Sequence, residues 1–252
     1  MTEQDRMTSL FFELFTGLPR QGPGDDASTL QALALVPDVG PDTRVLDLGC
    51  GTGRQTRTLA GGSPARFVGI DNHLPYVEAA TQEARTCSLA DRVEFRVGDM
   101  CQLEMPDRAF DLIWCEGAIY IVGVETGLHQ WRRLLMPAGH LVVSEACWMK
   151  PDPPPECVSF WNAEYPAIRS VETLLSVVGT CGWQTVAHFA LPRESWWTDY
   201  YGPLQHSVTQ FRQRHEHEPD AQELAHQVQR EIDMWVRYSE FYSYEFLVMR
   251  MG

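Results

Sequence analysis

Three glycines alternate with other residues directly after a strand-like run, in the stretch VLDLGCGTGR at residues 45–54. A glycine-rich turn between a strand and the following helix lets a ligand approach the backbone closely. The dinucleotide fingerprint G-x-G-x-x-G fails here, because its third glycine would fall at Arg54. The phosphate-loop motif fails as well, because no lysine follows these glycines. The stretch therefore predicts a site for a nucleoside-bearing ligand, with a tight turn that binds no ligand as the alternative.

Acidic residues lie near the ends of three successive predicted strands. Asp47 comes two positions before the first glycine, Asp71 about twenty residues after Gly51, and Asp99 in the segment VGDM. A carboxylate at position 71 could accept hydrogen bonds from both hydroxyls of an adenosine ribose. Asp99 could accept from the adenine amino group, and the Met100 backbone could meet a ring nitrogen. Any one of these acids could instead cap a helix, but three at successive strand ends favour a nucleoside site.

The elements that must position these residues alternate along the chain. From residue 44 to residue 147, short apolar strand-like runs alternate with segments of helical apolar spacing, among them a helix expected over 124–136. Such alternation predicts right-handed crossovers and a doubly wound, mostly parallel sheet of the α/β class. Two short helices are expected before it, at 8–18 and 26–36, separated by the breaker-rich loop RQGPG at 20–24. After it, the proline-rich span 148–166 predicts an irregular insert. The elements expected beyond the insert are a helix at 170–181, a strand at 184–191, helices at 198–214 and 219–240, and a last strand at 243–251.

Composition narrows the class of partner. The chain has 252 residues and a net charge of −14, so a nucleic-acid backbone or an anionic membrane would be repelled. No apolar stretch approaches the roughly 20 residues that cross a bilayer, and the first ten residues do not resemble a signal peptide, so a cytoplasmic location is expected. Seven scattered cysteines without a C-x-x-C pair argue against a disulfide framework or a zinc site. The run HEHE at 215–218 is interpreted as a solvated helix face, and no metal is expected.

With these motifs in place, the chain resembles the class I S-adenosylmethionine-dependent methyltransferases. VLDLGCGTG resembles the first motif of that family, GID its ribose-binding acid and VGDM its adenine-binding acid. FDLIWCEGAIYIV and LLMPAGHLVVSE resemble its fourth and fifth strands. The resemblance covers about residues 40–147. RQGPG and WCEGAIYIVG further resemble a bacterial subgroup of small-molecule type that is often left without an assigned substrate.

The resemblance implies a Rossmann-like sheet of seven strands with an antiparallel last strand, together with a helical cap. We expect one methyltransferase domain over residues 1–252. Within it, residues 1–38 would form an N-terminal helical lid, 40–147 the cofactor-binding core, and 148–252 a substrate-side insert with helices and the last strands. Transfer of a methyl group from S-adenosyl-L-methionine to a small-molecule acceptor, giving S-adenosyl-L-homocysteine, is the implied reaction.

Carried over to this chain, the resemblance assigns roles to single residues. Asp71 would hold the ribose and Asn72 would lie beside the adenine. Glu116 and Gly117 would lie near the sulfonium, and Tyr120 takes a place that is histidine in many relatives, so a histidine base is not expected. The remaining cofactor contacts would be the methionine side, formed by Asp47, Gly49, Cys50 and Gly51, and the adenine pocket, formed by Asp99 and Met100.

Methyl transfer from a sulfonium mainly requires donor and acceptor to be aligned and water to be excluded. Glu116 and Tyr120 are the candidate catalytic residues. Glu116 is expected either to act as a general base, to orient the acceptor, or only to make hydrogen bonds. Arg20 could pair with an anionic acceptor or the cofactor carboxylate. The residues expected to close over the acceptor are Arg20, Gln21, Trp148, Trp161 and Tyr165, with Trp196 and Trp197.

Aromatic walls of this kind suit a planar or cationic acceptor, and they also suit plain core packing. Two other classes of function stay open at this point. A non-catalytic protein that binds an adenosyl ligand would share every cofactor motif. An NAD-dependent oxidoreductase would share the sheet, although Arg54 disfavours it. A homodimer is possible.

Overall fold

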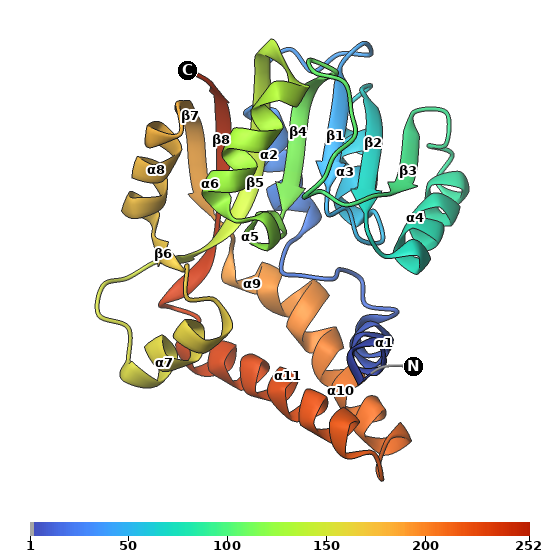
Figure 1. Ribbon diagram of the computed structural model, residues 1–252, viewed down its shortest axis with the longest axis vertical. Helices are drawn as coiled ribbons and strands as arrows, with labels where there is room; N and C mark the ends of the chain where they lie inside the picture. The colour runs from blue at the N-terminus through green and yellow to red at the C-terminus, as the bar shows by residue number, and fades with distance from the viewer. Residues whose placement is uncertain (1–2) are drawn as a thin grey trace.

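The computed structural model describes residues 3–252, so the first two residues of the predicted lid lie outside the described part of the chain. A single sheet organises the fold (Figure 1). In chain order its strands are β1 (Arg44–Leu48), β2 (Arg66–Asp71), β3 (Val93–Val97), β4 (Phe110–Glu116), β5 (Leu135–Trp148), β6 (Arg169–Ser170), β7 (Trp183–Ala190) and β8 (Tyr242–Met251).

The helices fall into three groups. The N-terminal pair is α1 (Glu3–Phe15) and α2 (Asp26–Ala34). The crossover helices are α3 (Arg54–Gly62), α4 (Leu74–Thr86), α5 (Ile119–Val122), α6 (Val124–Gln130), the 3-10 turn η1 (Trp131–Leu134) and α8 (Val171–Thr180). The remaining helices are α7 (Pro155–Glu164), α9 (Arg193–Trp196), the π-helical turn η2 (Trp197–Tyr201), α10 (Gly202–Arg214) and α11 (Pro219–Tyr238).

The strand order β3-β2-β1-β4-β5-β8-β7 confirms the predicted doubly wound sheet. The pairs joining β3, β2, β1, β4 and β5 are all parallel, and β8 runs antiparallel between β5 and β7. These seven strands form the main path, as predicted, and the two-residue strand β6 pairs with β5 beside it. Chain order reverses between β1 and β4, and at such a switch point the carboxyl ends of neighbouring strands leave a crevice.

Apolar side chains cover both faces of the sheet. One buried cluster joins the sheet to α2, α3 and α4 and continues into α1, α10 and α11. The other joins the opposite face to α6, η1 and α8. The first cluster is continuous because α1, α10 and α11 lie across the carboxyl end of the sheet, where the strand arrows point (Figure 1). The predicted helical cap is therefore present and shares its core with the sheet.

Two local predictions differ from the structure. The span 148–166 was expected to be irregular, but it contains the ten-residue helix α7. Pro154 and Pro155 precede and begin that helix, and proline at a first helical position loses no hydrogen bond that the helix would have made. The helix expected over 124–136 ends as α6 at Gln130 and continues only as the turn η1. In the described residues, no helix has the length and apolar character needed to span a bilayer.

Candidate active site

The glycine-rich loop between β1 and α3 has a backbone conformation that residues other than glycine could adopt only with strain. Gly49 has φ +71° and Gly51 φ +52°, both in the left-handed region that favours glycine. A Cβ on Gly49 would lie 2.6 Å from the Ala118 Cβ, and one on Gly51 would lie 3.0 Å from the Gln21 Oε1. The loop is therefore shaped for close approach of other groups to its backbone.

Asp71, at the carboxyl end of β2, holds this loop in place. Its Oδ2 accepts a hydrogen bond of 2.9 Å from the Gly51 N–H, and its Oδ1 accepts one of 2.9 Å from the His73 N–H. The carboxylate also lines the cavity beside the loop. Each carboxylate oxygen can accept a second hydrogen bond, so Asp71 keeps the capacity to receive a diol.

Asp47 lies beneath the loop and does not line the cavity. It is fully buried, its Oδ2 accepts a 2.5 Å hydrogen bond from the Thr56 hydroxyl, and its Oδ1 a weak one of 3.5 Å from the Gln55 amide. Burial raises the pKa of Asp47 to about 7, and the charges of Glu116 and Asp71 act in the same direction. The structure thus makes Asp47 a support that joins β1 to the first turns of α3.

Glu116, at the end of β4, lies at the centre of a buried polar network. Its Oε1 accepts hydrogen bonds of 2.8 Å from the Trp114 indole and 2.8 Å from the Thr29 hydroxyl. Its Oε2 accepts one of 3.3 Å from Arg20. Only 5% of the side chain is exposed, and burial raises its pKa. Three donors from the core and from the N-terminal segment therefore engage both of its oxygens.

Arg20 extends this network toward the glycine-rich loop. Besides Glu116 it contacts the Asp26 carboxylate at 2.9 Å, and Asp26 in turn pairs with Arg54 of α3 at 2.6 Å. Arg54, Thr58 and Arg20 hold the pKa of Asp26 well below its usual range despite the opposing effect of burial. The Arg20 Nε is buried and has no hydrogen-bond partner in the described chain, although Arg20 lines the cavity beside the loop. This orphaned donor points to an anionic group on a ligand.

The N-terminal segment is attached to both sides of the site. The Gln21 Oε1 accepts from the Thr52 N–H at 3.2 Å and from the Thr52 hydroxyl at 2.8 Å, at the tip of the glycine-rich loop. The Phe12 ring of α1 stacks on His73 at the start of α4, with ring centroids 3.4 Å apart. This segment therefore covers the carboxyl edge of β1 and β2, as a lid would.

Two cavities meet beneath this lid. The first, of about 190 Å³, lies along the glycine-rich loop and Asp71, with Arg20, Arg54 and Glu116 in its walls. The second, of about 250 Å³, lies between the ends of β5 and β8 and the cap helices. Both are lined by a shared set of residues, namely Phe11, Phe15, Gln21, Gly22, Pro23, Gly117 and Tyr120. A ligand in the first cavity would thus adjoin a ligand in the second.

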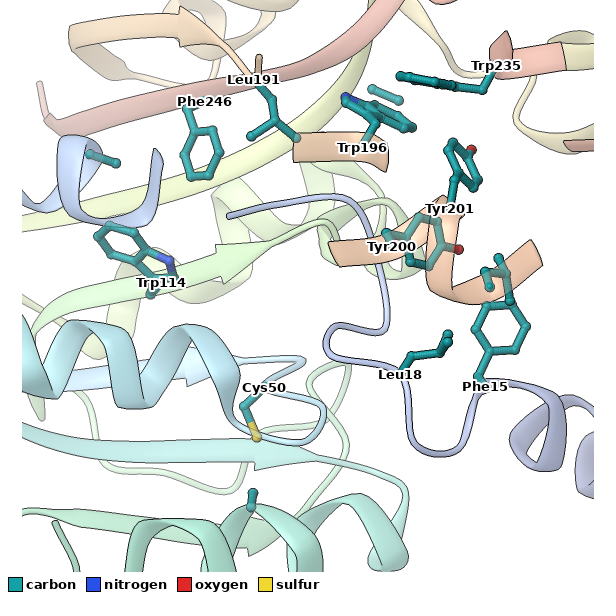
Figure 2. Packing of buried hydrophobic residues seen from close by; sticks show 14 of the residues in the cluster. Phe15, Leu18, Cys50, Trp114, Leu191, Trp196, Tyr200, Tyr201, Trp235 and Phe246 are labelled. Atoms are coloured by element: carbon teal, nitrogen blue, oxygen red, sulfur yellow. The ribbon is translucent and has the colours of Figure 1, made fainter. Parts of the chain in front are cut away.

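The second cavity is walled mainly by aromatic rings. Phe15 comes from α1, and Trp196, Tyr200 and Tyr201 come from α9 and η2, on the cap side of the sheet (Figure 2). Tyr244 on β8 closes the opposite wall. The polar members of the lining, besides the tyrosines, are Gln21, Ser144, Glu145, Glu164 and Glu231.

The predicted site residues divide by where they lie. Of the lid residues, Arg20 and Gln21 line the first cavity, and Gln21, Trp161 and Tyr165 line the second. Trp148 lies at the end of β5, paired with Tyr242, and lines neither cavity. The predicted cofactor contacts that border the first cavity are Gly49, Cys50, Gly51, Asp71, Glu116 and Gly117, whereas Asn72, Asp99 and Met100 lie outside both linings.

The adenine side is built differently from the expectation. Asp99 is exposed, and its Oδ1 accepts from the Cys101 N–H at 2.8 Å, as a turn-capping acid does. Met100 is buried with its sulfur facing the position of a Cβ on Gly49, and its carbonyl accepts a 3.3 Å hydrogen bond from Trp131. These two residues frame the loop from the side.

Several residues that line the second cavity were not predicted from the sequence. Glu145 does carry a sequence signal, because it is a charged residue inside the apolar run LVVSEAC. Tyr200, Glu231 and Tyr244 come from three elements far apart in the chain, and no local motif marks them. Residue order along the chain cannot reveal such a wall.

Comparison with known proteins decides the family. A family described as a methyltransferase domain matches residues 40–209, which is more than half of the chain. The chain belongs to this methyltransferase family. The family resemblance inferred from the motifs is thereby confirmed, and membership argues against the oxidoreductase alternative.

Relatives and solved structures extend this family assignment. Sterol 24-C-methyltransferase of Yarrowia lipolytica is 31% identical over 121 residues, which are 48% of this chain and 31% of that protein. Methyltransferase GfsG of Streptomyces halstedii is 29% identical over 153 residues, 56% of this chain and 55% of that protein. The chain thus matches about a third to a half of the length of these relatives. A methyltransferase of Geobacter sulfurreducens, crystallised with S-adenosyl-L-homocysteine, superposes with a TM-score of 0.83 at 22% identity, over 97% of this chain and 98% of that chain.

Proposed function

We propose that this methyltransferase-family protein transfers a methyl group from S-adenosyl-L-methionine to a small-molecule acceptor and releases S-adenosyl-L-homocysteine. The observation that carries the proposal is the meeting of two cavities at Gly117 and Tyr120. One cavity follows a glycine-rich loop at the switch point of a parallel sheet, where nucleoside ligands bind in such folds. The other offers a separate, mostly aromatic space for an acceptor.

The residues present fit this cofactor. Gly49 and Gly51 leave room for close approach to the loop, and Asp71 lines the same cavity. Arg20 also lines it, and its buried Nε has no hydrogen-bond partner in the described chain. Asp71 would hold the ribose, and Arg20 the methionine carboxylate. When bound, the cofactor supplies a methyl group already activated on a sulfonium. Asn72, Asp99 and Met100 remain proposed for the adenine side.

The protein's own part in the reaction is to align the methyl donor with the acceptor and to exclude water from the space between them. The N-terminal segment would close the junction, held by Gln21 on Thr52 and by Arg20 on Glu116. We assign Glu116 to positioning this segment, because three donors occupy its two oxygens. Tyr120 borders both cavities and is the residue placed to touch donor and acceptor.

Calorimetric titration tests the proposal. S-adenosyl-L-homocysteine should bind the wild-type protein, and Asp71→Ala should weaken binding roughly tenfold or more, because hydrogen bonds to a charged group contribute about 1.5–3 kcal/mol. Asp91→Ala, an exposed acid before β3, serves as the control and should bind normally. Binding of NAD without binding of either adenosyl compound would contradict the proposal. Acceptor-dependent formation of S-adenosyl-L-homocysteine separates an enzyme from a protein that only binds the cofactor. A cytoplasmic location and a homodimer stay predictions.

A further inference from the structure

The charge of the second cavity sets it apart from the first. Three carboxylates, those of Glu145, Glu164 and Glu231, belong to its lining, and among its described lining residues there is no lysine, arginine or histidine. The first cavity, by contrast, combines the bases Arg20 and Arg54 with the acids Asp71 and Glu116. A ligand with a negative group would therefore be repelled from the second cavity more strongly than from the first.

Two of these carboxylates have little compensation from bases. The Glu231 Oε1 accepts a 2.8 Å hydrogen bond from the Tyr201 hydroxyl, and the Tyr165 hydroxyl partly offsets the effect of burial on the pKa of Glu145. Arg169 acts on Glu145 electrostatically, but its guanidinium is paired with Glu125 at 2.8 Å. Burial raises the pKa of both carboxyls, that of Glu145 to about 7. Carboxylates buried with so little compensation are stabilised by a cation placed between them.

Aromatic rings surround the same space. Tyr120 is 48% exposed, and its partial desolvation, together with the charges of Glu231 and Glu145, raises its pKa. The pKa of Tyr244 is raised first by burial and then by Tyr120, and the charges of Glu145 and Glu231 raise it further. Both rings therefore lie within the field of both acids. Rings of tyrosine and tryptophan attract a cation over their faces, and their edges exclude water around it.

The size and donors of the cavity limit the ligand further. A volume of about 250 Å³ is below the roughly 300–1,000 Å³ of pockets for drug-sized ligands. Trp161 lines this cavity, and its buried indole N–H has no hydrogen-bond partner in the described chain. An oxygen on the ligand could accept from it.

We propose that the acceptor is a small amine, cationic in water, whose nitrogen lies against Glu145 and Glu231 inside the ring of tyrosines. This inference rests on the proposed function and names its substrate class. In the reaction, the ammonium first gives its proton to one of the two carboxylates. The amine nitrogen then forms a bond to the methyl carbon while the carbon–sulfur bond breaks. The sulfur keeps the bonding pair and becomes a neutral thioether, and the product is a methylated ammonium.

A pair of probes with the same shape and different charge tests the inference without turnover. Choline and 3,3-dimethyl-1-butanol differ in a quaternary nitrogen replaced by carbon, and 3,3-dimethylbutyrate adds a negative charge. Each is titrated calorimetrically into the full-length protein saturated with S-adenosyl-L-homocysteine. Choline should bind at least about tenfold tighter than the alcohol, since a desolvated cation over aromatic rings gains about 2 kcal/mol. Tetramethylammonium serves as a second, smaller cationic probe. The inference would be overturned by equal affinity for choline and the alcohol, by the absence of binding of choline or tetramethylammonium, or by tighter binding of 3,3-dimethylbutyrate.

Variants locate the binding site. Glu145→Gln and Glu231→Gln should each weaken choline binding several-fold and leave the affinity for S-adenosyl-L-homocysteine unchanged. Glu223→Gln removes the same charge from an exposed position of α11 and should change neither. Tyr120→Phe should retain choline binding and Tyr120→Leu should lose it. Unaltered choline binding in both carboxylate variants would also overturn the inference.

The two proposals fail in different ways. If S-adenosyl-L-homocysteine does not bind the wild-type protein, the proposed function fails. If it binds but the cationic probe has no advantage, only the inference about the acceptor fails. Thermal unfolding of each variant shows whether a lost signal reflects a lost fold.

Discussion

The two cavities are built from different materials. The one along the glycine-rich loop has as one wall the backbone of a short sequence motif, and its charged residues include the arginines Arg20 and Arg54. The one beside it is shaped by side chains from α1, β5, α7, η2, α11 and β8, and its charges are all negative. A shared cofactor can be held by a local motif of fixed geometry. An acceptor is recognised by a wall that can change residue by residue while the sheet stays the same.

The sharpest way to break the backbone-built cavity is to add a side chain to it. Gly49→Val would force a β-branched residue to φ +71°, with its Cβ only 2.6 Å from the Ala118 Cβ. We expect S-adenosyl-L-homocysteine affinity to fall by roughly a hundredfold or more, measured by calorimetry, because strain and steric overlap together cost about 3 kcal/mol. Gly61→Ala is the control, since no atom lies within 4 Å of a Cβ there, and it should bind normally. Normal binding by Gly49→Val would refute the close approach.

The next test concerns the hydrogen-bond network around Glu116, which connects the N-terminal segment to the wall of the first cavity. Glu116→Gln replaces an acceptor of three hydrogen bonds with a group that has one acceptor oxygen. Amide hydrogen exchange over residues 16–30 should quicken, and cofactor affinity should fall about tenfold. Turnover at saturating cofactor and acceptor should keep its pH profile. Glu94→Gln changes an exposed glutamate of β3 in the same way and is the matched control.

The opposite result would restore the catalytic role expected for Glu116. If turnover collapses and the pH profile loses a limb, while exchange of the N-terminal segment is unchanged, Glu116 acts as a base. Its network would then be a resting arrangement that opens when the acceptor binds.

These tests also mark how far the sequence could predict the molecule. The parallel part of the sheet and the loop geometry follow from local patterns, because glycine spacing and strand periodicity act over a few residues. The antiparallel direction of β8 was expected only from the family resemblance. Asp71 was placed at the cavity for the same reason. Asp47 was also expected to contact the cofactor, but it does not line the cavity, because whether a side chain at the end of β1 points into the cavity or beneath the loop depends on Thr56 and Gln55 of α3.

The second cavity was less predictable for a physical reason. Trp148, Trp161 and Tyr165 were all expected over the acceptor from the aromatic content of their segment. Trp161 and Tyr165 line the cavity, whereas Trp148 lies at the end of β5, where β5 pairs with β8, and does not line it. Glu231 and Tyr244 reach the cavity only through long-range packing. The HEHE run was read as a solvated face, yet His215 is bridged to Glu13 and Glu218 and has a side chain only 15% exposed. Contacts between distant elements decide these cases.

Asp47 offers a smaller test, on stability. Its pKa is raised in the folded protein from 3.8 to about 7, so its contribution to folding is most favourable below about pH 4 and declines as pH rises to 7. Asp47→Asn should therefore raise the free energy of unfolding at pH 8, by on the order of 2 kcal/mol, and have little effect near pH 4. Denaturant unfolding across this range measures it, with Asp91→Asn at an exposed position as control. A variant that is less stable than wild type at pH 8 would contradict the assignment.

The smallest expected effect concerns the outer attachment of the lid. Hydrogen bonds with Glu13 and Glu218 raise the pKa of His215. Its stabilising contribution is then complete below the ordinary histidine pKa near 6.5 and is lost as pH rises through the raised folded value. His215→Asn should quicken exchange in α1 at pH 6 and should matter less at pH 8. His217→Asn, two residues away and exposed, should change nothing at either pH.

The most direct measurement is a crystal structure of the protein grown with S-adenosyl-L-homocysteine. The account predicts the ligand along the glycine-rich loop, its ribose at Asp71 and its sulfur facing the cavity bordered by Gly117 and Tyr120. Density for the ligand elsewhere, or a ribose that makes no contact with Asp71, would contradict it.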